Sequence, residues 1–276
     1  MYRSVAGLVV FGACSASTEA APPSAVDAAA AEPPPVAVDG GMAPLAGAWA
    51  EQLALPAGGM AWVTPPVGAT EPRPVIIAVH GAIDDPGQHC STWRIIADAY
   101  AFVVCPAGRK VRTGTYVWSS SSAIDEAVDA ALVAVKERYG PYVADGPSIY
   151  VAFSQGANLA GPVITRKTGT PRFARTVLVE GGYRALETAQ AARAFHAAGG
   201  ERVLFACSQP GCATGFAIPA SALDRQGIPA RVLYPGSYGH AIPPAVRAAI
   251  NEALPWLVDG LPAWRSYAAH PKLPSH

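Results

Sequence analysis

The chain has 276 residues and carries 20 Lys and Arg against 20 Asp and Glu, so its formal net charge is zero. This balance gives no electrostatic basis for binding nucleic acid or an acidic membrane surface, and we expect no nucleic-acid partner. About half of the residues are hydrophobic (51%), and residues 45–259 are long enough to bury one large core. There is no Gly-rich phosphate loop, no Rossmann fingerprint and no cluster of histidines and cysteines at metal-ligand spacing, so we expect no metal and no organic cofactor.

Residues 1–14 are a candidate export signal. A short basic start precedes an apolar run from Val5 to Phe11, and Gly12-Ala13-Cys14 follows. The segment resembles a bacterial lipoprotein signal, which implies lipidation of Cys14 and a place at the outer membrane or cell surface, with a periplasmic or secreted protein as the alternative. An ordinary secretory signal, or a cytosolic chain with an apolar start, also fits. The run is too short to span a membrane as a helix, so any membrane contact would be made through the lipid.

Two segments lack the bulky apolar residues that a core requires. Residues 15–44 consist mainly of alanine, proline and small polar residues, which favours a disordered or extended tether over a folded unit. Residues 260–276 are rich in proline, and we expect them to form a C-terminal tail outside the domain. The predicted domain therefore covers residues 45–259.

From residue 59 onward, short apolar runs alternate with segments of helical period. The clearest helix is predicted over residues 122–139, where apolar residues recur at the spacing of one helix face. Ser91 is a candidate cap for a helix over residues 91–100. This alternation predicts an α/β protein with a mostly parallel central sheet and helices on both faces. The predicted strands cover residues 59–64, 74–79, 102–105, 148–153, 176–179, 201–206 and a run from 231, and the other predicted helices cover residues 185–198 and 243–257.

The most informative segment is a buried strand, a very tight turn and a helix start with one serine at the apex. The strand is Ser148–Phe153, the serine is Ser154, and Gln155-Gly156 opens a helix of small residues. This geometry holds a hydroxyl at a helix N-terminus, where backbone N–H groups can stabilise a developing oxyanion.

Two histidines follow predicted strands. His240 lies in a Gly-rich loop late in the chain, and an imidazole there can take the proton of Ser154 and return it to a leaving group. A solvated loop histidine is the alternative for His240. His80 begins a loop that also contains Asp84 and Asp85. We expect His80 to be structural, and the two aspartates to form loop hydrogen bonds or contact substrate.

These segments resemble, in their order and context, motifs of the α/β-hydrolase superfamily. Phe153-Ser154-Gln155-Gly156 is most similar to the phospholipase/carboxylesterase branch. The chain departs from the Gly-x-Ser-x-Gly pattern at Ala152, and alanine is the mildest replacement for a glycine at a close approach. The resemblance covers about residues 74–258 and implies the α/β-hydrolase fold.

The resemblance also implies roles for individual residues. Ser154 corresponds to the nucleophile and His240 to the general base, in the chain order serine, acid, histidine. The backbone N–H of Gln155 and that of Ala82 or Ile83 would form the oxyanion hole.

The acid of the triad is the part that the resemblance identifies least directly. Many members of the family carry it after the strand that precedes the last one, here residues 201–206, but no carboxylate lies between Cys207 and Ala222. Asp224 is too far along the next helical stretch. Glu180 ends the previous strand and is followed by two glycines that allow a sharp turn, so we predict that Glu180 orients His240. A structural role, as a cap or in an ion pair with an arginine, is the alternative.

Four cysteines remain once Cys14 is set aside. Cys207 and Cys212 bracket a Pro-Gly turn, and Cys90 and Cys105 flank one helix-strand unit. We therefore hypothesise two disulfides, Cys90–Cys105 and Cys207–Cys212, among the three pairings that four cysteines allow.

We expect an exported serine hydrolase that acts on small carboxylic esters or thioesters, with a carboxylesterase as the first choice. A serine peptidase or polyester depolymerase is the second, and a non-catalytic surface-binding protein on a hydrolase scaffold is the third. No inserted lid domain is evident, so we expect an open pocket. Aromatic residues in loops or at strand ends are its candidate lining, although packing in the core is an equally good interpretation of the tryptophans: Trp93, Tyr116, Trp118 and Tyr183.

Overall fold

The computed structural model describes residues 41–56 and 58–273. The predicted signal with Cys14, and the predicted tether up to residue 40, lie outside the described residues. Within them, no helix combines the length and the hydropathy needed to cross a membrane.

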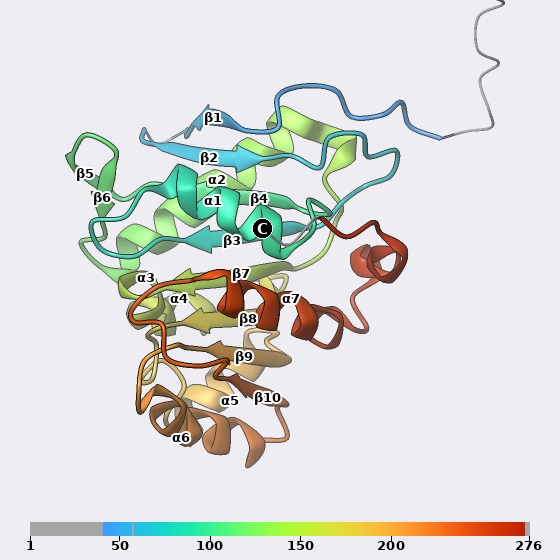
Figure 1. Cartoon of the computed structure of the whole chain (residues 1–276). Helices are drawn as coiled ribbons and strands as arrows, with labels where there is room; N and C mark the ends of the chain where they lie inside the picture. The colour runs from blue at the N-terminus through green and yellow to red at the C-terminus, as the bar shows by residue number, and fades with distance from the viewer. Residues whose placement is uncertain (1–40, 57, 274–276) are drawn as a thin grey trace, which may run out of the picture. The chain divides into compact units, whose positions relative to one another are not determined.

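The described residues form alternating strands and helices (Figure 1). The strands are β1 (Glu51–Ala54), β2 (Met60–Thr64), β3 (Val75–Val79), β4 (Phe102–Pro106), β5 (Arg109–Arg112), β6 (Thr115–Val117), β7 (Ser148–Phe153), β8 (Phe173–Val179), β9 (Arg202–Ala206) and β10 (Ala230–Leu233). The helices are α1 (Pro86–Ile96), α2 (Ser121–Tyr139), α3 (Gln155–Asn158), α4 (Ala160–Ile164), α5 (Ala189–Ala197), α6 (Cys212–Asp224) and α7 (Pro244–Val258), with short 3₁₀ turns at Gly140–Tyr142, Pro262–Trp264 and Tyr267–Ala269.

One sheet of eight strands, within the described residues, has the order β1-β2-β4-β3-β7-β8-β9-β10. Strands β4, β3, β7, β8, β9 and β10 pair in parallel, whereas β2 is antiparallel to both β1 and β4. The central strands β3 and β8 are buried along their whole length, as expected for parallel strands covered on both faces. The predicted mostly parallel sheet is therefore confirmed.

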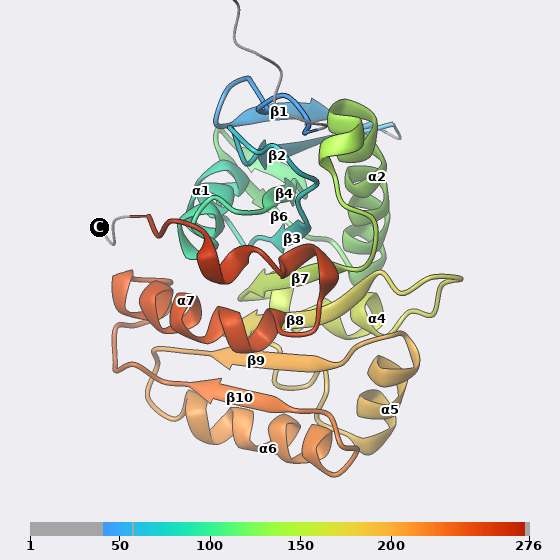
Figure 2. The same ribbon diagram turned by 90° about the vertical axis from the view of Figure 1, so that its right-hand side faces the viewer.

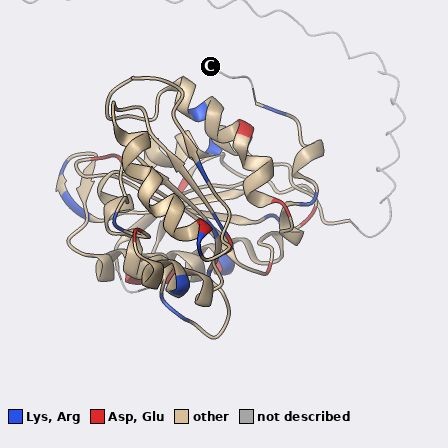
Figure 3. Cartoon of the chain, turned by 90° about the horizontal axis from the view of Figure 1, so that it is seen from below, with Lys and Arg blue, Asp and Glu red and all other residues tan. Residues whose placement is uncertain are grey.

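Helices cover both faces of this sheet (Figure 2). Helices α1 and α7 lie on one face, and their buried side chains belong to a single apolar cluster with one set of strand residues. Helices α2, α4, α5 and α6 supply the cluster on the opposite face. Because successive strand residues alternate between faces, each of the central strands β3, β4, β7, β8 and β9 contributes to both clusters. Charged residues are spread thinly over the domain (Figure 3).

Several helix and strand assignments differ from the sequence prediction, including strand β1, which was not predicted, and the start of α5 at Ala189 rather than at residue 185. Helix α1 begins at Pro86 rather than at Ser91, because the Asp85 side chain accepts hydrogen bonds from the backbone N–H groups of Gly87 and Gln88. An aspartate cap followed by proline at the first helical position is a strong start signal. The small hairpin β5–β6 lies between β4 and α2, where no strands were predicted.

The boundary predicted at residue 259 is too early. Tyr267 is 1% exposed and Trp264 is 3% exposed, and both belong to the apolar cluster that contains α1 and α7. The Tyr267 hydroxyl donates to Asp98 Oδ2 (2.8 Å), and Leu273 N donates to Asp98 Oδ1 (3.0 Å). Three aromatic side chains (Tyr100, Trp264 and Tyr267) pack against one another here, so the C-terminal segment is part of the domain despite its prolines.

Candidate active site

The carboxyl ends of neighbouring parallel strands bring the predicted site residues to one edge of the sheet. The residue after each strand still pairs with the strand beside it: Ser154 N donates to Val179 O (2.9 Å), and Glu180 N donates to Ala206 O (3.0 Å). Cys207 N continues the series by donating to Leu233 O (3.0 Å). These bonds fix the first residues of the loops after β7, β8 and β9 relative to one another, and the loop after β10 leads to His240.

Ser154 occupies a strained turn between β7 and α3. Its φ is 51° and its ψ is −112°, a combination that residues with a side chain rarely adopt. Gly156 makes the turn possible, because a Cβ placed there would lie 2.7 Å from both His80 O and Val79 Cγ1. Ala152, which replaces the expected glycine, is fully buried in β7. The turn therefore presents the Ser154 hydroxyl outside the sheet edge.

Backbone strain gathers around this edge. Within the described residues, Ile83, Ser154 and Glu180 are three of the five non-glycine residues with positive φ, at 54°, 51° and 54°. The other two (Asp98 and Ala99) follow helix α1. Strained backbone of this kind persists where the surrounding structure enforces it and is frequent at functional sites.

His240 contacts the Ser154 hydroxyl directly. Its Nε2 lies 2.7 Å from Ser154 Oγ, and its ring packs at 5.1 Å from the ring of Phe153, the last residue of β7. Its side chain is 46% exposed, so the pair faces solvent. A serine and an imidazole at this separation have the geometry of a nucleophile and its base.

Glu180 lies behind His240 and is buried. Its Oε2 is 3.7 Å from His240 Nδ1, and its side chain has no exposed surface. The other oxygen, Oε1, accepts from the Ser208 backbone N–H and lies 2.8 Å from Ser208 Oγ. Gln209 Nε2 donates to Oε2 at 2.7 Å. The structure thus brings Ser154, His240 and Glu180 together in one row, with Ser208 and Gln209 holding the carboxylate.

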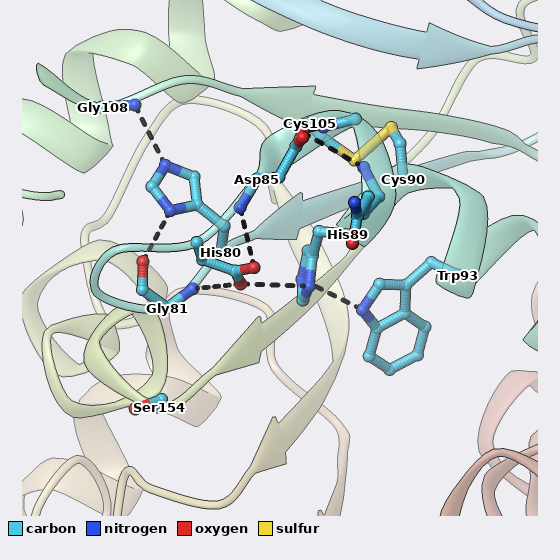
Figure 4. A network of polar contacts seen from close by, with 12 residues as sticks. His80, Gly81, Asp85, His89, Cys90, Trp93, Cys105, Gly108 and Ser154 are labelled. Atoms are coloured by element: carbon cyan, nitrogen blue, oxygen red, sulfur yellow. Dashed lines mark hydrogen bonds and ion pairs between the residues drawn. A yellow bond between two sulfur atoms is a disulfide. The ribbon is translucent and has the colours of Figure 1, made fainter. Parts of the chain in front are cut away.

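The loop after β3 lies against the Ser154 turn (Figure 4). A Cβ on Gly81 would be 3.3 Å from Ser154 Cβ, so this loop is in contact with the turn. The Asp84 carboxylate accepts from Gly81 N (3.0 Å) and tightens the loop. The backbone N–H groups of Ala82 and Gln155 donate no hydrogen bond to any described residue, so both are available to an oxyanion.

His80 is a structural residue in this loop. It is fully buried, its Nδ1 lies 2.7 Å from Gly81 O, and its Nε2 accepts from Gly108 N (3.1 Å). Burial lowers the pKa of His80, so the ring is neutral near pH 7 and Nδ1 is the donor. Both ring nitrogens are occupied by the backbone, which leaves His80 no proton to exchange with a substrate.

A second buried histidine, His89, supports the loop from α1. Its Nε2 accepts from Trp93 Nε1 (3.2 Å), and its Nδ1 lies 3.9 Å from Asp84 Oδ2. Burial lowers the pKa of His89 to about 4 against the opposing effect of the Asp84 carboxylate. The neutral ring thus links Trp93 in the core to the carboxylate that tightens the loop.

The aromatic candidates for the pocket divide between core and rim. Trp93 is 1% exposed within the α1–α7 cluster, so it packs in the core and does not line an open pocket. Trp118 is also buried and stacks on His80 at 4.8 Å, while its backbone exchanges hydrogen bonds with the Gln155 side chain. Tyr116 is also buried and is only 8% exposed. Tyr183 is half-buried against Phe216, and burial and then the Glu180 carboxylate raise the pKa of its hydroxyl.

The structure pairs the cysteines as Cys90–Cys105 and Cys207–Cys212, with Cα separations of 5.7 and 6.2 Å. The first pair joins α1 to β4. The second closes the loop that holds Ser208 and Gln209. No group of three or more histidine, cysteine or acidic residues in the described part of the chain is arranged to hold a metal ion.

Ser208 and Gln209 were missed in the sequence. They follow directly on a buried strand, in the loop where the family resemblance led us to seek a carboxylate. The available signal was a polar pair at the carboxyl end of a parallel strand, since such ends share one edge of the sheet.

Comparisons of structure agree with this topology. Esterase PE8 is similar over 75% of this chain and 100% of its own, with a TM-score of 0.54 and 18% sequence identity. A fluorophosphonate-binding serine hydrolase of Staphylococcus aureus is similar over 76% of this chain and 97% of its own (TM-score 0.54, 14% identity). A Thermus thermophilus protein is similar over 76% of this chain and 98% of its own, with a TM-score of 0.56 and 15% sequence identity. The chain has the α/β-hydrolase fold. No protein-family model matches the sequence, and neither does the sequence of any curated protein.

The α/β-hydrolase turn at Ser154 gives a stability prediction at Gly156. We expect Gly156→Ala to lower the free energy of unfolding by about 1–3 kcal/mol, because the new Cβ would meet the backbone oxygen of His80 rather than a flexible side chain. Chemical denaturation measures this. Gly169→Ala is the control, since a Cβ at Gly169 meets nothing within 4 Å; equal effects in the two variants would contradict the close approach.

Proposed function

We propose that this protein is a serine hydrolase that cleaves carboxylic esters or thioesters through an acyl-enzyme on Ser154. The observation that carries the proposal is the 2.7 Å contact between Ser154 Oγ and His240 Nε2 at a strained turn. The available N–H groups beside it support the same chemistry. Two proteins with similar structures are described as an esterase and as a fluorophosphonate-binding serine hydrolase, which agrees with a carboxylesterase as the first choice.

The proposed reaction has two halves. Ser154 Oγ attacks the acyl carbon while its proton passes to His240 Nε2, and the resulting oxyanion accepts hydrogen bonds from the N–H of Gln155 and of Ala82 or Ile83. His240 then gives the proton to the leaving alcohol or thiol as the bond to the acyl carbon breaks. Water, activated by the same imidazole, releases the acid and restores Ser154.

Glu180 would stabilise the imidazolium that forms in each half. Its carboxylate is fully buried and lies 3.7 Å from His240 Nδ1, where its negative charge would offset the positive charge that the ring gains during each half-reaction. The backbone N–H of Ser208 donates to Glu180 Oε1 and holds the carboxylate in place. This assigns Glu180 the role of the triad acid.

The proposed setting is outside the cytoplasm. Two disulfides in a domain of this size suit an oxidising compartment, which agrees with the export signal and lipid anchor expected at Cys14. The substrate would be a small ester approaching from solvent, since His240 and Ile83 are both exposed.

A second candidate is a non-catalytic binding protein on the same scaffold. The observation that favours it is Gln209, whose amide nitrogen lies between Glu180 and His240 and separates the acid from the base. If that separation were permanent, Ser154 would not be activated.

Labelling with a fluorophosphonate distinguishes the two candidates. We expect the folded protein to be modified at Ser154, because phosphonylation requires an activated nucleophile, and we expect Ser154→Ala to abolish both labelling and the hydrolysis of activated esters. Mass spectrometry locates the modified residue. A folded protein that takes up no probe at Ser154 would favour the binding-protein alternative.

Replacement of Glu180 tests the acid. We expect Glu180→Gln to lower kcat for ester hydrolysis by on the order of 10⁴-fold, because the imidazolium loses its counter-charge. Glu187→Gln is the control, since Glu187 is an exposed glutamate just before α5. Circular dichroism checks that both variants are folded. An unchanged kcat in Glu180→Gln would show that another group orients His240.

A further inference from the structure

We propose that Gln209 is a positioning residue that holds His240 in the tautomer unable to accept the Ser154 proton, so that its side chain must withdraw before the site reacts. The link to catalysis rests on the proposed serine-hydrolase function. The assignment of the His240 tautomer does not rest on that function, because it follows from three distances around His240.

The Gln209 amide fills the space between the acid and the base. Its Nε2 is 2.7 Å from Glu180 Oε2 and 2.8 Å from His240 Nδ1, whereas Oε2 and Nδ1 are 3.7 Å apart. Both short distances are hydrogen-bonding distances, and the long one is not. One amide nitrogen therefore serves both neighbours with its two N–H groups.

The carboxylate decides which end of the amide lies here. With the amide oxygen in this position, an oxygen lone pair would face Glu180 Oε2 at 2.7 Å, which is repulsive for an ionised carboxylate. With nitrogen there, the carboxylate gains a donor that compensates its complete burial. Glu180 thus fixes the orientation of Gln209.

The orientation of Gln209 in turn fixes the proton on His240. An amide nitrogen donates but does not accept, so Nδ1 must be the acceptor and carries no proton. A neutral imidazole has one N–H, which is then at Nε2 and donates to Ser154 Oγ across 2.7 Å. In this state the nitrogen that should take the serine proton already holds one.

The productive state requires a proton at Nδ1, directed at Glu180 Oε2. Rotation of the Gln209 side chain into solvent would let the 3.7 Å gap close. The backbone can stay in place, because Gln209 O accepts from Cys212 N (3.2 Å) and the Cys207–Cys212 disulfide closes the same loop. The backbone of Gln209 is therefore held in place, whereas its side chain is free to rotate.

The test compares Gln209→Ala with the wild type and with Gln190→Ala, a control at an exposed glutamine of α5. Nitrogen NMR of the histidine rings, at a pH where they are neutral, reports the tautomer; a His240→Gln variant assigns the signal. We expect Nδ1 of His240 to be unprotonated in the wild type and in Gln190→Ala, and protonated in Gln209→Ala. We also expect Gln209→Ala to react about tenfold faster with a fluorophosphonate at Ser154, the factor that one lost hydrogen bond represents.

Each outcome bears on one of the two proposals. A protonated Nδ1 in the wild type would overturn the role of Gln209, and so would measurable labelling of both proteins at a rate that is no higher in Gln209→Ala than in the wild type. If neither protein is labelled while the NMR tautomers are as expected, Gln209 keeps its role and the serine-hydrolase function is wrong. Labelling of Gln209→Ala alone would support the role of Gln209 and would favour the binding-protein alternative for the wild-type chain.

Discussion

The site depends on one constraint, the common register of the parallel strands at their carboxyl ends. Val179 pairs with both Phe153 and Ala206, and Ala206 pairs with Leu233. A shift of one residue in any of these strands would turn its side chains to the opposite face and move the following loop along the edge. Because β7, β8 and β9 are almost entirely buried, their apolar residues enforce this register. The separation of Ser154 from Glu180 is thus set by the core, because each of them directly follows a buried strand.

The proposed acid, Glu180, is held by a loop that follows a neighbouring strand. Glu180 is a fully buried carboxylate, and its neighbours in the described structure are Ser208, Gln209 and the His240 ring. A buried charge needs hydrogen bonds to offset its lost hydration. The loop after β9 provides them. This loop has no carboxylate of its own, but it holds Glu180, which follows the neighbouring strand β8. Its disulfide restricts this loop and keeps its donors in place.

Local patterns were enough to predict a mostly parallel sheet and the turn at Ser154, although they missed strand β1 and the β5–β6 hairpin. Buried strands such as β3 and the serine between a strand and small residues are specified by short runs of sequence. The start of α1 was misplaced because Asp85 was assigned to the loop, although it is followed by proline. The C-terminal segment was taken for a tail because its prolines hide the fact that Tyr267 packs on Tyr100, far away in sequence. Gln209 was missed for the same reason. Its partners are Glu180, which follows β8, and His240 in the loop after β10, and no local sequence pattern indicates such contacts.

The account requires that Ser154 carries the acyl group during turnover. The most direct measurement is pre-steady-state hydrolysis of an activated aryl ester, with the mass of the intact protein followed in the same samples. We predict a burst of released phenol close to one equivalent per chain and a matching acyl adduct that maps to Ser154, followed by slower turnover. Turnover without a burst and without any adduct at Ser154, even when the reaction is quenched early by acid, would contradict the account.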